Sequence, residues 1–298
     1  MRHPANELGD TRSGLFFALA AYGIWGIAPI YFVWVSFAQP LEVVAHRVVW
    51  GIPLLGLLLL ASGQWRSIKS LAPSAFGYLL VSALCLSINW LTFIYAVQTE
   101  RIAEASLGYF INPLVSIVLG WLFLREQLRP LQWLAVALAL VGVCSELWVR
   151  TNLPWLGLTL ALSFGLYGLL RKQVNVGAVV GLSIETAVVA PFAIGFLFWL
   201  SLHGDARGLG AVLSLGLGGL ITVVPLICFA AAAMRLPLTT LGFVQYLSPS
   251  CALMLAIFVY GEVVPAGRWV TFALIWGALI LFSFEGFYRY RKQRQQPE

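Results

Sequence analysis

The sequence predicts an all-α membrane protein with ten transmembrane helices, built as two inverted five-helix repeats around a central cavity. A highly apolar composition, a series of long apolar runs and an internal repeat support this prediction. Hydrophobic residues make up 60% of the 298 residues and charged residues only 10%, whereas an ordinary soluble domain has about 25% charged residues. A soluble fold of this composition would expose far too much apolar surface. We therefore expect an integral membrane protein.

The apolar runs are long enough to cross a bilayer as helices, which takes roughly 20 residues each. Short loops separate them, and none of these loops is long enough for a soluble domain. The ten expected spans are 14–34, 41–62, 74–97, 103–124, 131–149, 155–170, 179–202, 211–234, 238–260 and 269–288. The five-helix repeats are then 14–149 and 155–288, and polar cytoplasmic tails are expected at 1–13 and 289–298.

An internal repeat relates the two halves of the chain. The stretch 89–133 aligns without a gap with 225–269 when the numbering is shifted by 136. Pro113 then meets Pro249, and each copy contains two apolar spans. A repeat unit with an odd number of spans enters the membrane upside down the second time. Inverted repeats of this kind underlie many secondary transporters, whose substrate site lies near the midplane between the halves.

The basic residues are unequally divided between the two sides of this topology. With both termini in the cytoplasm, the outer loops hold Arg101, Arg150, Arg207 and Arg268, and Arg47 lies within a span, which leaves thirteen of the eighteen Lys and Arg residues inside. Cytoplasmic loops carry such an excess of positive charge, so both termini are expected in the cytoplasm. The inside residues are scattered apart from the C-terminal run, and nucleic acid is therefore not an expected partner.

The sequence lacks the residues that nucleotide-driven or metal-dependent chemistry requires. None of the lysines follows a glycine, as the phosphate-cradling loop of a nucleotide-driven pump demands. His3, His46 and His203 lie far apart and pair with no cysteine or carboxylate at metal-ligand spacing. We expect no enzyme activity, cofactor, metal or bound nucleotide.

The span 41–62 begins with the sharpest group of candidate site residues. Polar groups at membrane depth are costly and usually face a cavity or a partner. Glu42 and His46 are four residues apart and share a helix face, whereas Arg47 lies about 100° further round the helix. The group predicts a site for a substrate anion or a coupling proton near the outer mouth. Alternatively, it is a structural ion pair at the interface, with Arg47 snorkelling.

Three further polar or aromatic residues lie within spans. Glu185 needs a partner or a shifted pKa, as a proton carrier or as a hydrogen-bonded tie between helices. Asn89 could contact a polar group of a substrate while Trp90 stacks on an aromatic one. The alternative for Asn89 is an interhelical hydrogen bond.

The two repeated prolines predict kinks near the midplane. Each lacks a hydrogen-bond donor and clashes with the carbonyl four residues back, which belongs to Tyr109 before Pro113 and to Gln245 before Pro249. Freed backbone is tolerated there only where protein or water satisfies it. We interpret the prolines as marking a binding cavity lined by the spans 103–124 and 238–260, or as hinges for gating. The alternative is a static kink packed against a neighbouring helix. The candidate cavity residues beside them are Tyr109, Asn112, Gln245 and Tyr246, and weaker candidates are Tyr22, Trp25 and Tyr167.

Three other carboxylates lie near span ends and are expected to be structural. Glu104 lies at the start of its span and is expected to cap that helix, favoured by the helix dipole. Glu126 and Glu262 are equivalent in the repeat. Both are expected to be interfacial carboxylates paired with nearby arginines.

Several motifs resemble the RarD proteins of the drug/metabolite transporter superfamily. They are Glu42-Val-Val-Ala-His-Arg, Asn89-Trp, Glu104-Ala-Ser-Leu-Gly-Tyr-Phe-Ile-Asn-Pro-Leu, Arg171-Lys, Ile184-Glu-Thr and Thr240-Leu-Gly-Phe-Val-Gln-Tyr. The resemblance covers nearly the whole chain and implies paired EamA-type repeats, ten helices, a bacterial inner-membrane location and a permease role. The label of chloramphenicol or antibiotic resistance that such proteins carry describes a phenotype and does not establish a substrate.

We therefore expect a secondary-active permease that moves a small metabolite or drug-like molecule across the inner membrane by alternating access. Chloramphenicol or another amphipathic or aromatic compound fits the apolar, aromatic walls, and a proton is a candidate coupling ion. The lipid bilayer is the expected surrounding. The alternatives are a membrane-embedded lipid-modifying enzyme, which would need a convergent catalytic set, and a passive channel, which would need rings of like residues.

Overall fold

The computed structural model describes residues 4–148, 154–174, 176–204, 207–261, 263–264 and 266–294, and in these ranges the regular secondary structure is helical throughout. The helices in chain order are α1 (Pro4–Trp34), α2 (Pro40–Ala61), α3 (Trp65–Lys69), α4 (Pro73–Gln98), α5 (Ile102–Phe123), α6 (Pro130–Trp148), α7 (Trp155–Gln173), α8 (Ala178–His203), α9 (Leu209–Arg235), α10 (Leu238–Gln245), α11 (Leu247–Phe258) and α12 (Ala266–Arg294). This confirms the predicted all-α class.

Within the described ranges, nine helical segments are long and apolar enough to cross a membrane, α10 and α11 counting together as one. The chain is therefore a multi-pass membrane protein. The expected span at 155–170 corresponds to α7, which is not among the nine. Ten residues of α7 are buried, Ser163 and Arg171 among them, and the helix packs against both α4 and α5. Most of α7 is covered by protein, although Trp155, Leu162 and Leu166 remain exposed. Such a helix needs less apolar surface than one that faces lipid on most sides.

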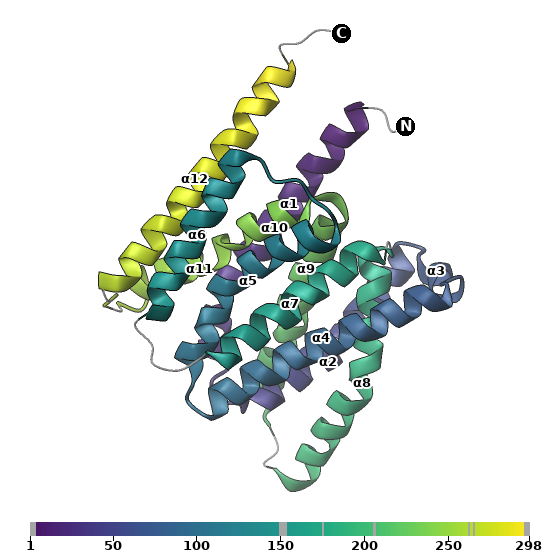
Figure 1. Ribbon diagram of the computed structural model, residues 1–298. Helices are drawn as coiled ribbons and strands as arrows, with labels where there is room; N and C mark the ends of the chain where they lie inside the picture. The colour runs from purple at the N-terminus through teal and green to yellow at the C-terminus, as the bar shows by residue number, and fades with distance from the viewer. Residues whose placement is uncertain are drawn as a thin grey trace.

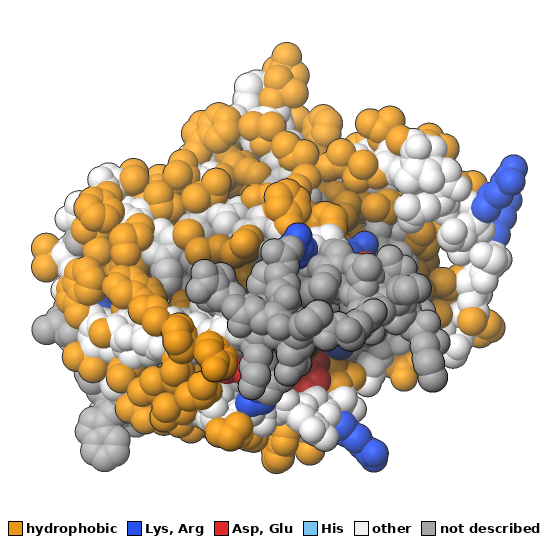
Figure 2. Space-filling view, turned by 90° about the horizontal axis from the view of Figure 1, so that it is seen from above, with side chains coloured by type: hydrophobic (Ala, Val, Ile, Leu, Met, Phe, Trp, Pro, Cys, Tyr) orange, Lys and Arg blue, Asp and Glu red, His pale blue; other side chains and the backbone are white. Residues whose placement is uncertain are grey.

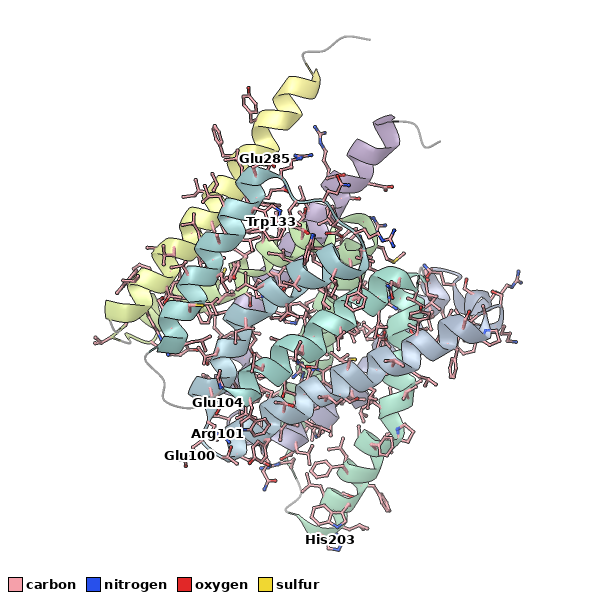
Figure 3. The ribbon with its side chains drawn as sticks, in the orientation of Figure 1. Glu100, Arg101, Glu104, Trp133, His203 and Glu285 are labelled. Carbon is pink, nitrogen blue, oxygen red and sulfur yellow. The ribbon has the colours of Figure 1, made fainter. Side chains whose placement is uncertain are left out.

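The outer surface is strongly apolar, as contact with lipid requires. The half of α8 that ends at His203 extends away from the other helices (Figures 1 and 3). It exposes Phe192, Phe198 and Leu202 at 78%, 66% and 65% of their surface. Figure 2 shows the end of the molecule at which α12 finishes, where hydrophobic side chains surround much of the edge and few charged ones are visible.

The helices form close pairs between distant parts of the chain. The helix α6 lies along α12 on one side of the molecule (Figure 1), and α5 packs against α10. On the other side, α2 contacts both α8 and α9, while α4 packs on α7 and α1 on α9. Arg129 Nη1 lies 2.6 Å from Glu285 Oε1, which links the start of α6 to α12 (Figure 3). The start of α1 and the end of α12 lie at the same end of the bundle (Figure 1).

The helix bounds differ from the expected spans in three places. The helix α1 already begins at Pro4, and α12 continues to Arg294, so both expected tails are partly helical. The expected span 238–260 is divided at Tyr246 into α10 and α11, three residues before Pro249. In contrast, α5 remains one continuous helix through Pro113. The two prolines therefore have different local consequences although their positions in the repeat are equivalent.

Candidate substrate site

Arg47 extends from α2 into the interior of the bundle. Its Nε donates to Thr222 Oγ1 of α9 at 2.6 Å. The guanidinium carbon lies 5.5 Å from the ring centroids of both Trp90 on α4 and Phe32 on α1, a distance at which a cation is attracted to an aromatic face. The alternative in which Arg47 snorkels to the interface does not account for these contacts with a hydroxyl and two aromatic rings.

A small cavity lies beside this arginine. Arg47, Trp90, Glu185 and Thr222 are among the residues that line it. Its volume is about 10 Å³, which is room for about one water molecule. Tyr109 of α5 lies within electrostatic range of Arg47 and exposes 49% of its surface. A substrate could enter this cavity only if the surrounding helices move apart.

Arg47 has no acidic partner among the described residues. The ion pairs within the described ranges involve Arg101, Arg129, Arg171, Arg207 and Arg268. A guanidinium at membrane depth without a counter-ion is costly and is commonly associated with a functional site. Arg47 is thus the charged residue of this site for which the described structure shows no neutralising partner.

Glu185 is buried in a network that joins three helices. Tyr167 Oη of α7 donates to its Oε2 at 3.3 Å, and Ser82 Oγ of α4 donates to its Oε1. Arg171 Nη1 of α7 lies 3.6 Å from Oε1, and both side chains are almost completely inaccessible. The carboxylate charge is therefore neutralised within the protein, an arrangement that ties α8 to α4 and α7.

Glu42 and His46 do not join Arg47 in one cluster. Glu42 forms a two-pronged ion pair with Arg207, whose Nε and Nη2 lie 3.0 and 2.8 Å from the two carboxylate oxygens. His46 Nδ1 is buried without a hydrogen-bond partner in the described structure. The one-turn spacing had suggested a common site, but Arg207 approaches from the segment before α9. Within the described ranges, no three His, Cys, Asp or Glu side chains converge as metal ligands would.

Asn89 links α4 to α7 and does not point into the cavity at Arg47. Its Nδ2 donates to Leu160 O at 2.9 Å and to Ser163 Oγ at 3.1 Å. This geometry matches the interhelical hydrogen bond expected as the alternative to substrate contact. The neighbouring Trp90 is the member of this pair that lines the cavity.

The two proline segments lie against each other where α5 crosses α10. Tyr246 Oη donates to Phe110 O at 3.2 Å, and Ser116 Oγ lies 3.5 Å from Gln245 Oε1. A Cβ at Gly242 would lie only 2.8 Å from Pro113 O, so this close crossing requires glycine. Asn112 Oδ1 is buried near this contact and has no hydrogen-bond partner among the described residues.

The weaker aromatic candidates belong to the packed core. Tyr22 and Trp25 of α1 contact Phe229 of α9 with ring centroids 6.2 and 6.0 Å apart. Tyr167 stacks on the same phenylalanine at 5.7 Å. These rings fill the space between α1, α7 and α9 and do not border the cavity at Arg47.

Two carboxylates cap the N-termini of helices other than their own. Glu104 Oε1 accepts from Leu156 N at the start of α7 at 3.0 Å, whereas it was expected to cap α5. Glu126 accepts from Leu238 N at 2.6 Å and Thr239 N at 2.8 Å at the start of α10, whereas pairing with a nearby arginine was expected. The positive end of the helix dipole favours both contacts. Glu262, which is the repeat equivalent of Glu126, lies outside the described residues.

Some residues of the site are difficult to recognise as site residues from the sequence alone. Thr222 and Ser82 are ordinary hydroxyl residues within apolar spans, and such residues commonly bond to the backbone of their own helix. Arg171 is marked only by the Arg171-Lys motif of the family resemblance. Arg207 is one of several loop arginines. Their partners depend on which helices pack together.

Comparisons with known proteins agree with the fold and the motifs. Residues 12–145 match the model of the EamA-like transporter family. Protein RarD of Salmonella typhimurium is 46% identical over 290 residues, which cover 95% of this chain and 99% of the relative. An uncharacterized transporter of Vibrio cholerae is 45% identical, with 93% of this chain and 94% of the relative covered. A protein of Pseudomonas aeruginosa named chloramphenicol-sensitive protein RarD is 32% identical, with 95% and 97% covered.

A solved structure described as a crystal structure of a protein has the same fold. Its TM-score is 0.72 at 16% sequence identity, and 91% of this chain and 97% of that chain are covered. The sequence relatives extend over nearly the whole chain, as the motifs do. The chain therefore belongs to the RarD family of permeases, within the drug/metabolite transporter superfamily.

Proposed function

We propose that this chain is a secondary-active permease that moves a small organic molecule across the bacterial inner membrane by alternating access. The observation that carries the proposal is Arg47, which lies beside a cavity inside the bundle with aromatic rings around it and no acidic partner in the described structure. A protein that only needed to be stable in the membrane would gain little from an unpaired cation there.

An inverted five-helix repeat supports alternating access. The 136-residue shift relates α4 to α9, α5 to the pair of α10 and α11, and α6 to α12. Equivalent elements pack on each other, since α5 contacts α10 and α6 contacts α12. The contact of α4 with α7 has its counterpart in the contact of α9 with α1. A two-fold axis in the membrane plane produces both kinds of pairing.

The positions of the chain ends favour ten crossings. Nine crossings would leave the start of α1 and the end of α12 on opposite sides, but they lie at the same end of the bundle (Figure 1). The largely buried helix α7 would supply the tenth crossing. The excess of Lys and Arg on the side of both termini then indicates that this side is cytoplasmic.

Reconstitution tests the proposed function directly. Untargeted metabolite profiles of cells with and without the protein first identify compounds whose levels change. These compounds, together with chloramphenicol, are then tested for uptake into proteoliposomes with and without a pH gradient. We expect saturable uptake that is accelerated by the same compound inside, and a response to the pH gradient if a proton is coupled. Large single-channel currents, or flux no greater than in protein-free liposomes, would contradict the proposal.

A further inference from the structure

We propose that Arg47 binds the carboxylate of a small aromatic anion with a single negative charge, which makes such anions the substrate class of the cavity. The inference rests on the proposed permease function and specifies what that permease recognises. Charge, hydrogen-bonding geometry and the surrounding rings each support it.

The charges beside the cavity leave one positive charge uncompensated. Glu185 lines the same cavity, but its oxygens face Ser82, Tyr167 and Arg171. The pair of Glu185 and Arg171 is neutral as a unit, so only the charge of Arg47 remains. A bound monoanion would neutralise it, whereas a dianion would bring a second charge that has no partner there. Neutralisation of the Arg47 charge therefore favours a ligand with one carboxylate over a phosphate monoester.

The guanidinium is held in place while its outer nitrogens remain free to bind. Thr222 Oγ1 accepts from Arg47 Nε at 2.6 Å and donates to Gly218 O at 2.7 Å, so the hydroxyl is anchored in α9. Among the described residues, Nη1 and Nη2 of Arg47 have no hydrogen-bond partner. A planar guanidinium presents such nitrogens in a fork that matches the two oxygens of a carboxylate. Thr222 is thus a positioning residue for the anion site.

Aromatic rings lie close to the Arg47 guanidinium, and that of Trp90 also lines the cavity. Phe32 and Trp90 both lie 5.5 Å from the guanidinium carbon, and Tyr109 of α5 is half exposed within electrostatic range. Cation–π attraction orients the guanidinium against these rings. Trp90 is the aromatic residue among those that line the cavity, and most of the remaining lining is aliphatic. An apolar pocket with one aromatic face and one fixed charge suits a small aromatic compound. The small cavity implies that binding accompanies separation of the surrounding helices.

Ligand-dependent thermal unfolding of the full-length purified protein tests the inference without any need for transport. The probes are benzoate and phenylacetate, their uncharged amides benzamide and phenylacetamide, and phenyl phosphate as a dianion, all at constant ionic strength. We expect a saturable rise of the unfolding midpoint with the carboxylates alone. Arg47→Gln should weaken this apparent affinity about 10- to 100-fold, and Arg47→Lys should retain part of it.

Arg66→Gln is the matched control, because Arg66 is an exposed arginine on the short helix α3; it should leave the response unchanged. If Arg47→Gln does not fold, Arg47→Lys and Thr222→Val are used to test the inference instead. Unchanged carboxylate affinity in both of these variants contradicts it. So does the absence of a saturable response in the wild type, an equal response to the amides, or tighter binding of phenyl phosphate. If carboxylates do not bind but an uncharged compound shows counterflow, the permease function is retained and only the proposed substrate class is rejected. If carboxylates bind but no compound shows counterflow, the anion site is retained and the permease function is rejected.

Discussion

Arg47 and Arg171 both extend into the helix bundle, and they differ in what neutralises them. Arg171 is completely buried, and its Nη1 lies 3.6 Å from a carboxylate oxygen of Glu185. Arg47 contacts a hydroxyl and two rings but no carboxylate in the described structure. A buried pair is balanced within the protein and stabilises only its own geometry. A partly buried cation that has no acidic partner among the described residues keeps its capacity to bind, which distinguishes the structural arginine from the proposed binding arginine.

The largest expected effect comes from breaking the internal pair. Glu185→Gln leaves Arg171 buried without a counter-charge, and we expect the free energy of unfolding to fall by about 3–5 kcal/mol. Chemical unfolding in detergent measures this change. The double variant Arg171→Leu with Glu185→Leu removes both charges and should recover most of the loss. Equal stability of Glu185→Gln and wild type would mean that Arg171 is not stabilised by this pair.

Arg47→Gln should produce the opposite pattern. Removing an unpaired cation from the membrane interior relieves a cost, so the unfolding free energy should stay unchanged or rise. Transport of the compound identified by metabolite profiling should fall at least about tenfold, since the bond to a charged ligand is lost. Initial uptake rates in proteoliposomes and unfolding in detergent are measured on the same preparation, with Arg66→Gln as the control. A loss of stability as large as that of Glu185→Gln would abolish the distinction between the two arginines.

Effects smaller than that of Glu185→Gln are expected from the hydroxyls that bond to each charged group. Ser82→Ala removes a hydrogen bond to Glu185 and should lower the unfolding free energy by about 1.5–3 kcal/mol. Thr222→Val removes the bond to Arg47 and should weaken substrate affinity several-fold, about 0.5–1.5 kcal/mol, with little effect on unfolding. Paired unfolding and uptake measurements on both variants test this. The comparison fails if the Thr222 variant mainly loses stability or the Ser82 variant mainly loses affinity.

The two repeated prolines show the limit of inference from local rules. Both were expected to kink their helices, and the chain is interrupted at Tyr246 before Pro249 but continuous through Pro113. A proline removes the same donor at both sites. What differs is the packing, because Gly242 of α10 lies against Pro113 O and Tyr246 is tied to Phe110 O. These contacts come from the pairing of the two segments, which local propensity does not encode.

The sequence by itself determined the membrane class, most of the helix positions, the internal repeat and the family, since composition, apolar run length and contiguous motifs are local properties of the chain. It also identified Glu42, Arg47 and Glu185 as polar residues at membrane depth, because such residues are rare there. Only the tertiary structure decided their partners. Glu42 binds Arg207, Arg47 binds Thr222 and Glu126 caps α10, each across more than a hundred residues of sequence. Such pairings are set by which helices pack together and at what depth, and spacing along a single helix contains neither piece of information.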